Sequence, residues 1–269
     1  MTVQNESTSE RPSNAQVASV ARALTDLRGA QIKGTAEAIS IQWIPKYTLL
    51  ERSMHWLHTA VSFILVLTGA VLYLPLLQPL AIGEAGLSLR LVHRAAGAFF
   101  VLLPIVYLLF QPRRLLMSLR EFMFDKEDLG WLKGALGYYL LGKHTDMPPQ
   151  GRFNTGEKIN GVVMIVTWGI FCVTGLVMWF GKGSIPPALF HWMVLLHDLA
   201  MIAGVCMFLV HLYLAVAHPL MWAALVSMRF GVTSADYAAE HHAKWYYGPA
   251  RAMEMYAAKK KAHAEKGGR

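Results

Sequence analysis

Four long runs of apolar residues divide the chain, and charged and polar residues are frequent between them. The runs cover residues 55–74, 91–110, 159–180 and 189–217. Each is near or above the roughly 20 residues that an α-helix needs to cross a hydrocarbon layer of about 30 Å. None alternates apolar and polar residues with a period of two, which argues against β-barrel strands. The pattern predicts an all-α integral membrane protein built as a four-transmembrane-helix bundle.

The composition supports a membrane class. Only 16% of the 269 residues are charged and 55% are hydrophobic, whereas soluble proteins carry about 25% charged residues. The two cysteines, Cys172 and Cys206, lie in separate runs, and no CxxC or CxxCH motif occurs. This excludes covalent c-type haem attachment by the usual motif and argues against cysteine-held iron–sulfur clusters in this chain.

Basic residues are distributed unevenly between the segments that connect the runs. The net charge is +8, and most Lys and Arg residues precede the first run, separate the second from the third, or follow the fourth. The connectors after the first and third runs hold only Arg90 and Lys182. The positive-inside rule then predicts that both termini and the middle loop are cytoplasmic. The basic segments are expected to face anionic lipid and not nucleic acid.

The same reading divides the chain into three parts. Residues 1–45 form a polar N-terminal extension without the apolar core of a signal peptide, so it is expected to be disordered or to bind a partner. Residues 46–228 form the four-helix transmembrane domain. Residues 229–269 form a basic cytoplasmic C-terminal tail.

Histidines supply the candidate chemistry. His197 and His211 lie fourteen residues apart in the fourth run, which in an α-helix is a rise of roughly 21 Å and an offset of about 40°. One helix therefore carries two imidazoles on one side at two depths. With the predicted orientation, His93 in the second run matches the outer depth of His197, and His55 in the first run matches the inner depth of His211. The two pairs predict two bis-His b-type haems, which are electron carriers because no coordination position is left for substrate.

Other histidines have a plainer interpretation. A single histidine in or near a span is commonly interfacial or hydrogen-bonded, and we prefer this for His58 and His218. His58 lies one turn from His55 and is the rival ligand at the inner level. The remaining histidines are expected outside the spans, in solvent or at an interface: His144, His191, His241, His242 and His263.

Small residues near the histidines allow a flat macrocycle to approach the backbone, although they serve plain helix packing equally well. They are Gly69, Gly97, Gly175, Ala200 and Gly204.

Several sequence blocks resemble the cytochrome b (gamma) subunits of membrane-bound formate dehydrogenases. The blocks are 51–56 (ERSMHW), 91–97 (LVHRAAG), 125–132 (DKEDLGWL), 151–158 (GRFNTGEK) and 240–246 (EHHAKWY). The resemblance runs from Lys46 to Tyr246, and the family's four haem ligands fall on the histidines chosen above. It implies a subunit of a bacterial inner membrane, with two b haems, that does not itself oxidise formate. Electrons would come from an iron–sulfur (beta) subunit, beside a molybdenum or tungsten catalytic (alpha) subunit, and pass to quinone.

The resemblance also implies a quinone site beside the inner haem. In the family's pattern an Asn-x-Gly loop lies next to the quinone, which corresponds here to Asn154 and Gly156. Glu157 stands where the family often has glutamine. It is either a proton donor to the quinone or a carboxylate that a helix N-terminus favours.

Buried haem propionates need cationic or amide partners. Arg52, Arg94 and Lys158 are placed to face a propionate or the quinone, but the arginines can also extend to the membrane surface by themselves.

Two other functions fit part of the pattern. A similar b-haem subunit serves nickel–iron hydrogenases and thiosulfate- or tetrathionate-type molybdenum oxidoreductases. A haem-free membrane anchor, with hydrogen-bonded histidines only, belongs to a different class. The identity of the partner subunits distinguishes a formate dehydrogenase subunit from the similar subunits of those other enzymes. Haem absorption would exclude the haem-free anchor.

Overall fold

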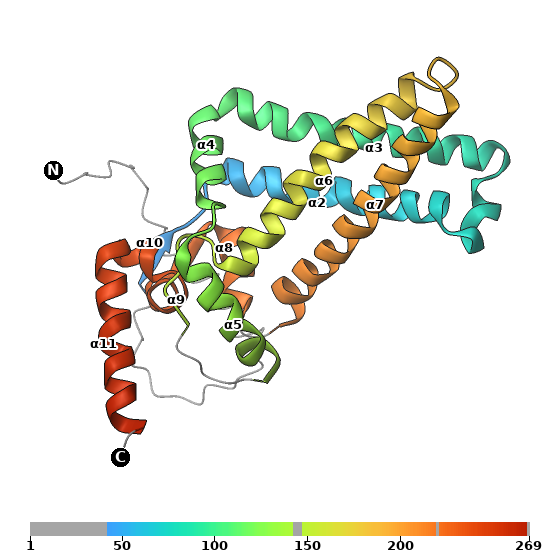
Figure 1. Cartoon of the computed structure of the whole chain (residues 1–269). Helices are drawn as coiled ribbons and strands as arrows, with labels where there is room; N and C mark the ends of the chain where they lie inside the picture. Colours follow the sequence, from blue (N-terminus) through green and yellow to red (C-terminus); the bar gives the residue numbers. More distant parts are fainter. Residues whose placement is uncertain (1–41, 142–146, 219–220, 268–269) are drawn as a thin grey trace, which may run out of the picture.

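The computed structural model describes residues 42–141, 147–218 and 221–267, and helices make up most of this part of the chain (Figure 1). Four helices are long and apolar enough to cross a membrane by length and composition. They are α2 (Leu49–Tyr73), α3 (Gly83–Phe110), α6 (Thr155–Phe180) and α7 (Pro187–Leu212). The predicted set of four spans is confirmed.

Three of these helices begin well before the apolar runs that predicted them. Thr48 and Glu51 form a capping box at the start of α2, in which each side chain bonds the other's backbone N–H. Asn154 and Glu157 form the same arrangement at the start of α6. These bonds satisfy N–H groups that the first turn of a helix leaves without partners. The start of a helix is therefore set by its cap, whereas the apolar run marks only the part suited to lipid.

The four long helices form two hairpins. α2 joins α3 through residues 74–82, which include the 3₁₀ segment η1 (Pro75–Ala81), and α6 joins α7 through residues 181–186. Helix-to-helix contacts are mostly within each hairpin, and the two hairpins run at an angle to one another (Figure 1). Aromatic side chains join them: the Phe63 and Phe208 rings lie 5.0 Å apart, and the Trp168 indole N–H donates to the Phe100 carbonyl at 3.1 Å.

Large apolar side chains cover the outside of the bundle. Leu67 is 66% exposed and Phe99 is 62% exposed, and in the most apolar part of each long helix no more than 11% of the residues are buried. An apolar surface of this extent is unstable in water and suits a hydrocarbon environment.

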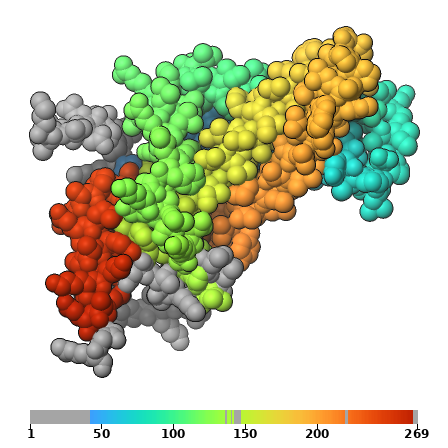
Figure 2. Space-filling model, in the orientation of Figure 1, coloured from blue at the N-terminus to red at the C-terminus, as the bar shows by residue number. Residues whose placement is uncertain are grey.

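Shorter elements gather at one end of the bundle, which we call the capped end (Figures 1 and 2). The opposite end, with the connections 74–82 and 181–186, is the hairpin end. The helices at the capped end are α4 (Pro112–Glu121), α5 (Lys126–Leu141), α8 (Trp222–Phe230), α9 (Ala235–His241), α10 (Ala243–Tyr247) and α11 (Pro249–Gly267).

A two-stranded antiparallel sheet ties the two sides of the predicted transmembrane domain together. Strand β1 (Trp43–Pro45) pairs with β2 (Val232–Ser234), with Ile44 opposite Thr233. Both strands lie beyond the predicted bounds of 46 and 228, so the folded unit is wider than the apolar pattern indicates. The residues predicted as a basic tail form α9, α10 and α11. The predicted N-terminal extension lies outside the described residues except for 42–45.

The fourth long helix ends in a change of helical type. After Leu212 the chain continues as a π-helical turn, η2 (Tyr213–Ala217). The backbone N–H of His218 donates to the backbone carbonyl of Tyr213 at 3.0 Å. π-Helical turns are rare and often occur at functional sites. This one begins two residues after His211.

Candidate functional site

The histidine pair at the capped end comes from different hairpins. His55 lies on α2 and His211 on α7, and their ring centroids are 6.2 Å apart. Two metal–nitrogen bonds of about 2 Å each account for roughly 4 Å of this separation, and the two ring radii account for the rest. The centroid separation is therefore close to that of two imidazoles bound to one metal ion.

The pair toward the hairpin end is held by hydroxyl groups. His93 Nδ1 lies 2.7 Å from Thr68 Oγ1, and His197 Nδ1 lies 2.8 Å from Thr174 Oγ1. Each threonine hydroxyl also bonds the carbonyl four residues earlier, on Ile64 or Ile170, at 2.7 Å. A hydroxyl has one proton, so it donates to the carbonyl and accepts from the histidine. Nδ1 then carries the ring proton and Nε2 is the nitrogen free to bind a metal.

Glycines lie beside both of these rings. A Cβ on Gly69 would lie 3.5 Å from His93 Cε1, and one on Gly175 would lie 3.9 Å from His197 Cε1. Gly97 has no such neighbour, and Gly204 faces Phe171 and Thr167. Gly69 and Gly175 therefore leave room beside the imidazoles, whereas Gly204 serves helix packing.

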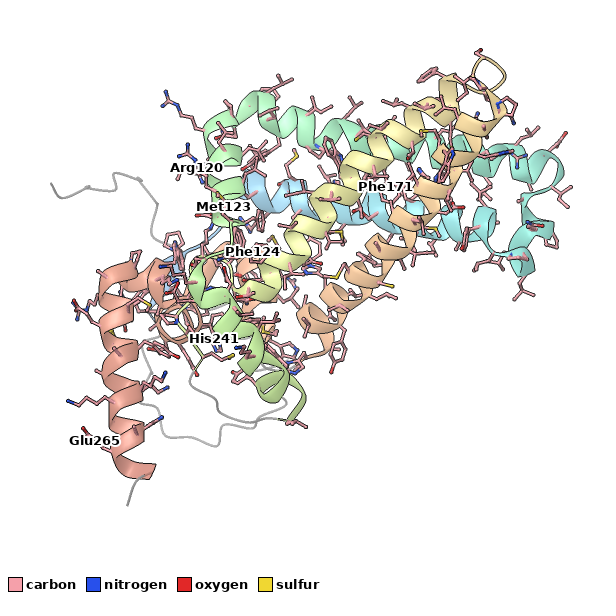
Figure 3. All side chains as sticks on the ribbon, viewed as in Figure 1. Arg120, Met123, Phe124, Phe171, His241 and Glu265 are labelled. Atoms are coloured by element: carbon pink, nitrogen blue, oxygen red, sulfur yellow. The ribbon has the colours of Figure 1, made fainter. Side chains whose placement is uncertain are left out.

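The rival ligand His58 has a different neighbour. Its ring lies against Phe100 at 4.4 Å between centroids, whereas His55 faces His211. Phe100 and Phe171 lie 6.1 Å apart, and Phe171 in turn contacts His197 at 4.9 Å. Figure 3 labels Phe171 on α6. An aromatic column thus lies between the two histidine levels and includes His58.

The donor set is typical of a metal that is bound within a macrocyclic cofactor. Within the described residues, no group of three or more His, Cys, Asp or Glu side chains is placed to hold a metal ion. Each level instead supplies two imidazoles, one from each hairpin. An iron held by two protein ligands needs its other positions filled by the group that carries it, and a haem does this. The residues present are therefore suited to hold haem.

The loop predicted to contact quinone is part of a helix cap. Asn154 Oδ1 accepts from Glu157 N–H at 2.9 Å, and Glu157 Oε2 accepts from Asn154 N–H at 2.8 Å. Glu157 thus has the role of a helix N-terminal carboxylate, one of its two predicted roles. The cap uses the oxygen of the Asn154 amide and leaves its NH₂ group as the donor. A Cβ on Gly156 would lie 3.2 Å from Asn154 Oδ1 and 3.3 Å from the Trp131 ring, so a larger residue there would require these side chains to shift.

A buried ion pair lies behind this loop. Lys158 and Asp128 are 4% and 3% exposed, and Lys158 Nζ lies 2.8 Å from Asp128 Oδ2. Thr155 Oγ1 lies within hydrogen-bond distance of Asp128 Oδ1, at 2.6 Å, and of Gln150 Oε1, at 3.0 Å. Lys158, predicted to face a propionate or the quinone, has its ammonium bound to a carboxylate and fixes α5 against the start of α6.

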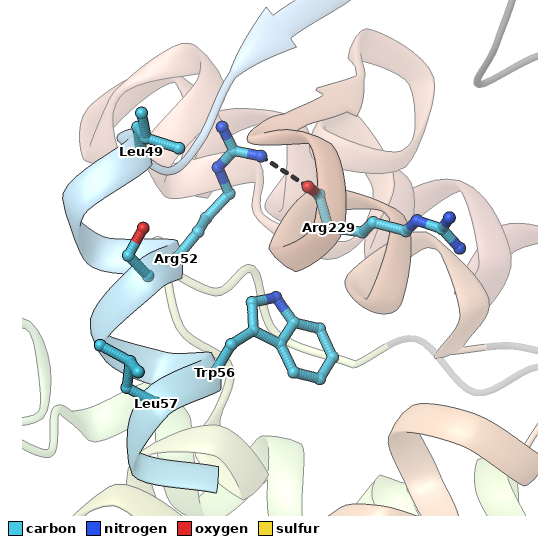
Figure 4. Close-up of a pocket in the computed structure, with 6 residues that line it drawn as sticks. Leu49, Arg52, Trp56, Leu57 and Arg229 are labelled. Carbon is cyan, nitrogen blue, oxygen red and sulfur yellow. Dashed lines mark hydrogen bonds between the residues drawn. The ribbon is translucent and has the colours of Figure 1, made fainter. Parts of the chain in front are cut away.

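The two predicted arginines lie at opposite ends of the bundle. Arg52 donates to the Arg229 carbonyl at 2.5 Å, and with Leu49, Trp56 and Leu57 these residues line a cavity of about 560 Å³ at the capped end (Figure 4). Arg94 lies 6.0 Å over the Trp179 ring. Each arginine is therefore near the depth of one histidine pair.

The structure encloses two of the histidines that are not proposed as haem ligands. His242 is 1% exposed, and its Nδ1 lies 2.9 Å from the Gly151 carbonyl while Nε2 lies 3.1 Å from Lys46 Nζ. The solvent or interface prediction for His242 is wrong, because the β1–β2 pairing places Lys46 against it. His218 is 8% exposed and bonds the Tyr139 carbonyl at 3.2 Å, which agrees with the predicted hydrogen-bonded role. His144 lies outside the described residues.

The surroundings of His242 predict a pH-dependent stability. Burial, followed by the charge of Lys46, lowers the pKa of His242 from 6.5 to about 4. The neutral ring is therefore favoured in the folded state, and its contribution is present above pH 6.5 and lost as the pH falls from 6.5 through 4. It amounts to no more than about 3 kcal/mol. Thermal unfolding of the purified protein in detergent across this range measures it.

His242→Asn is the matched control for that measurement. Asparagine keeps an N–H near the Nδ1 position for the Gly151 carbonyl but has no titratable group. The variant is expected to have a lower melting temperature and a flatter pH dependence than the wild type. An unchanged pH dependence would show that other groups cause it.

Sequence reasoning missed the threonines, the Asp128–Lys158 pair and the Lys46–His242 contact. The threonines left a signal, since the first and third runs share the pattern Thr-Gly-x-Val at 68–71 and 174–177. The other two contacts join residues 30 and 196 positions apart, and nothing in a single sequence marks such pairs.

Comparison with known proteins gives a consistent set of matches. A family model described as prokaryotic cytochrome b561 matches residues 46–231. The nitrate-inducible formate dehydrogenase cytochrome b556(Fdn) subunit of Escherichia coli K12 is 26% identical, over 81% of this chain and 95% of that protein. The cytochrome b556(fdo) subunit of the same strain is 26% identical, over 76% and 92%. The cytochrome b556 subunit of a Haemophilus influenzae formate dehydrogenase is 24% identical, over 72% and 79%.

Proposed function

The chain belongs to the prokaryotic cytochrome b561 family, and from that premise we propose that it is the dihaem membrane subunit of a formate dehydrogenase complex. It passes electrons from an iron–sulfur subunit to quinone, and a separate catalytic subunit oxidises formate. Membership of the family implies b-type haem, and the four apolar helices make the chain a membrane protein. The observation that carries the proposal is the pair of histidine levels, each completed by two different hairpins.

The ligand sets follow from this arrangement. His55 and His211 hold the haem at the capped end, and His93 and His197 hold the haem toward the hairpin end. A bis-His b haem takes up and releases one electron at a time without binding substrate. The contact of His58 with Phe100 supports His55 as the ligand at the capped end.

The proposed orientation places the capped end in the cytoplasm of a bacterial inner membrane. Lys46, which precedes α2, and the basic residues of α4 and α5, between α3 and α6, lie at this end, as the positive-inside rule requires. The iron–sulfur partner then meets the hairpin end, and quinone is reduced near the cytoplasmic surface. Electrons move inward while protons are taken up from the cytoplasm, which builds a membrane potential.

The start of α6 suits the reduction of a quinone. Thr155 and Gly156 have backbone N–H groups in the first turn, where no helical acceptor exists, and the Asn154 amide adds a side-chain donor. Donors at a helix N-terminus favour negative charge that develops on a carbonyl oxygen. The start of α6 lies at the capped end, as do His55 and His211, which supports a quinone position beside the inner haem. Arg52 and Arg94 are the cations proposed for the propionates at the two depths.

Formate, as the substrate of the partner subunit, is supported by the names of the relatives. Co-purification from the source membrane distinguishes the alternatives. A molybdenum or tungsten subunit with formate activity supports the proposal, and nickel–iron subunits overturn this part of it.

The quinone site is tested by the reoxidation of the reduced haems with a soluble quinone analogue. Asn154→Asp and Asn154→Ser keep an acceptor for the α6 cap but remove the amide donor. Loss of one hydrogen bond to developing charge costs about 1.5–3 kcal/mol, so we expect roughly 10- to 100-fold slower reoxidation. The wild-type spectrum must show two low-spin b haems. Absence of haem overturns the whole proposal, and unchanged reoxidation in both variants overturns the Asn154 role.

A further inference from the structure

Two buried threonines occupy matching positions in the two hairpins. Thr68 on α2 is 7% exposed and bonds His93 on α3, and Thr174 on α6 is 1% exposed and bonds His197 on α7. Each threonine comes directly before the glycine that lies beside the same ring. The hydrogen bond between threonine and histidine, with a glycine beside the ring, thus occurs once in each hairpin at the outer histidine level.

The carbonyl contacts of the two hydroxyls assign a direction to these hydrogen bonds. Thr68 donates its only hydroxyl proton within its own helix, to Ile64, and Thr174 does the same to Ile170. Neither hydroxyl has a second proton for a histidine, so both accept from Nδ1–H. A hydrogen bond from the non-ligating nitrogen makes an imidazole a stronger electron donor and fixes its ring orientation.

The inner level has no such pair among the described residues. His55 Nδ1 is buried and has no hydrogen-bond partner within the described part of the chain. The hydroxyls of Thr59 and Ser62, one and two turns after His55 on α2, bond backbone carbonyls of α2. The two histidine levels therefore differ in what lies behind the ligands.

We propose that Thr68 and Thr174 are positioning residues that hold His93 and His197 with Nε2 toward the outer haem iron and lower the reduction potential of that haem relative to the inner one. This inference rests on the proposed dihaem function. Stronger electron donation stabilises the oxidised iron, so the hydroxyls make the outer haem the weaker oxidant. Electron transfer from the outer to the inner level is thereby favoured.

The test replaces each hydroxyl with a methyl group of similar shape. In Thr68→Val and Thr174→Val we expect the midpoint potential of the outer haem to become more positive, with a larger shift in the double variant. The inner haem should keep its wild-type potential. Spectroelectrochemical titration of the purified full-length protein measures both potentials, and low-spin electron paramagnetic resonance signals report the ligand geometry.

Two further variants separate positioning from plain packing. Thr68→Ser and Thr174→Ser keep the hydroxyl and should restore the wild-type potential, as well as any haem that a valine variant loses. Thr167→Val is the matched control, because Thr167 is 4% exposed on α6 and bonds Val163 at 2.9 Å without contacting a proposed ligand. It should leave both potentials unchanged.

Three results would overturn the inference: valine variants with unchanged potentials, an equal shift of both haems, or serine variants that shift as far as the valine ones. These results leave the proposed function intact, since the wild type still holds two low-spin haems. A wild-type protein with fewer than two such haems contradicts the proposed function itself.

Discussion

Replacement of His197 with alanine is expected to remove the outer haem and leave the inner one, so that the haem content of the purified protein falls by half. His197 and His211 share α7 but face different partners, and the latter pairs with His55 at 6.2 Å. Loss of an axial nitrogen removes one of two protein bonds to the iron and leaves the other pair untouched. His211→Ala should give the complementary spectrum, with the outer haem alone.

The two variants should also differ in electron transfer. In His197→Ala the electrons from the iron–sulfur partner have no outer haem to enter, so reduction of the inner haem by formate should be lost. In His211→Ala the outer haem should still be reduced, and reoxidation by quinone should fail. Haem extraction with pyridine gives the content, and difference spectra of the complex give the reduction.

His58→Ala is the control for both variants, because His58 lies one turn from His55 and its ring lies against Phe100. It should retain two haems. If His58→Ala loses the inner haem and His55→Ala does not, the ligand is His58. If His197→Ala and His211→Ala each keep two intact haems, the ligand assignment is wrong.

Substitution of Asp128 with alanine is expected to lower the free energy of unfolding by about 3–5 kcal/mol, the usual cost of removing one partner from a buried ion pair. Lys158 is then buried without its close carboxylate, since Asp125 lies 3.8 Å away and is largely exposed. Thr155 also loses its contact with Asp128. The start of α6, with Asn154 and Gly156, should lose its fixed position, so quinone reduction should fall together with stability. Thermal unfolding and quinone reductase assays measure the two effects.

A neighbouring variant and a double variant make this prediction specific. Glu127 precedes Asp128 but pairs with Lys244 near the surface, where it is 23% exposed. Glu127→Gln should therefore cost no more than about 1 kcal/mol. The double variant Asp128→Leu with Lys158→Met removes both charges and should recover most of the stability. A double variant less stable than Asp128→Ala would contradict the role given to the unpaired ammonium.

The sequence predicted the parts of this molecule that are governed by one-dimensional patterns. Four spans follow from apolar runs because lipid requires about 20 apolar residues in a row. The pairing of His55 with His211 follows from the predicted orientation of the helices, and the two rings lie 6.2 Å apart in the structure. The pairing of His93 with His197 stays a prediction. The early start of α2 is also encoded locally, by the capping residues Thr48 and Glu51. The apolar run alone places the start of the helix later.

The remaining features depend on tertiary structure. The shared pattern Thr-Gly-x-Val marks Thr68 and Thr174 as a pair but does not show what they bond, because a hydroxyl bonded to its own helix needs no other partner. Only the packing of α3 and α7 against them brings His93 and His197 within reach. His242 is buried because β1 and β2 join segments nearly 190 residues apart. Such contacts follow from how the chain folds back on itself.

The division into two hairpins has a consequence for biogenesis. The two helices of each hairpin pack along one another. The two hairpins can therefore insert into the bilayer one after the other. Each proposed ligand pair takes one imidazole from each hairpin, so a bound haem would connect the two hairpins. We therefore expect haem binding to stabilise the association of the two hairpins, so that a chain without haem unfolds more readily than the loaded protein.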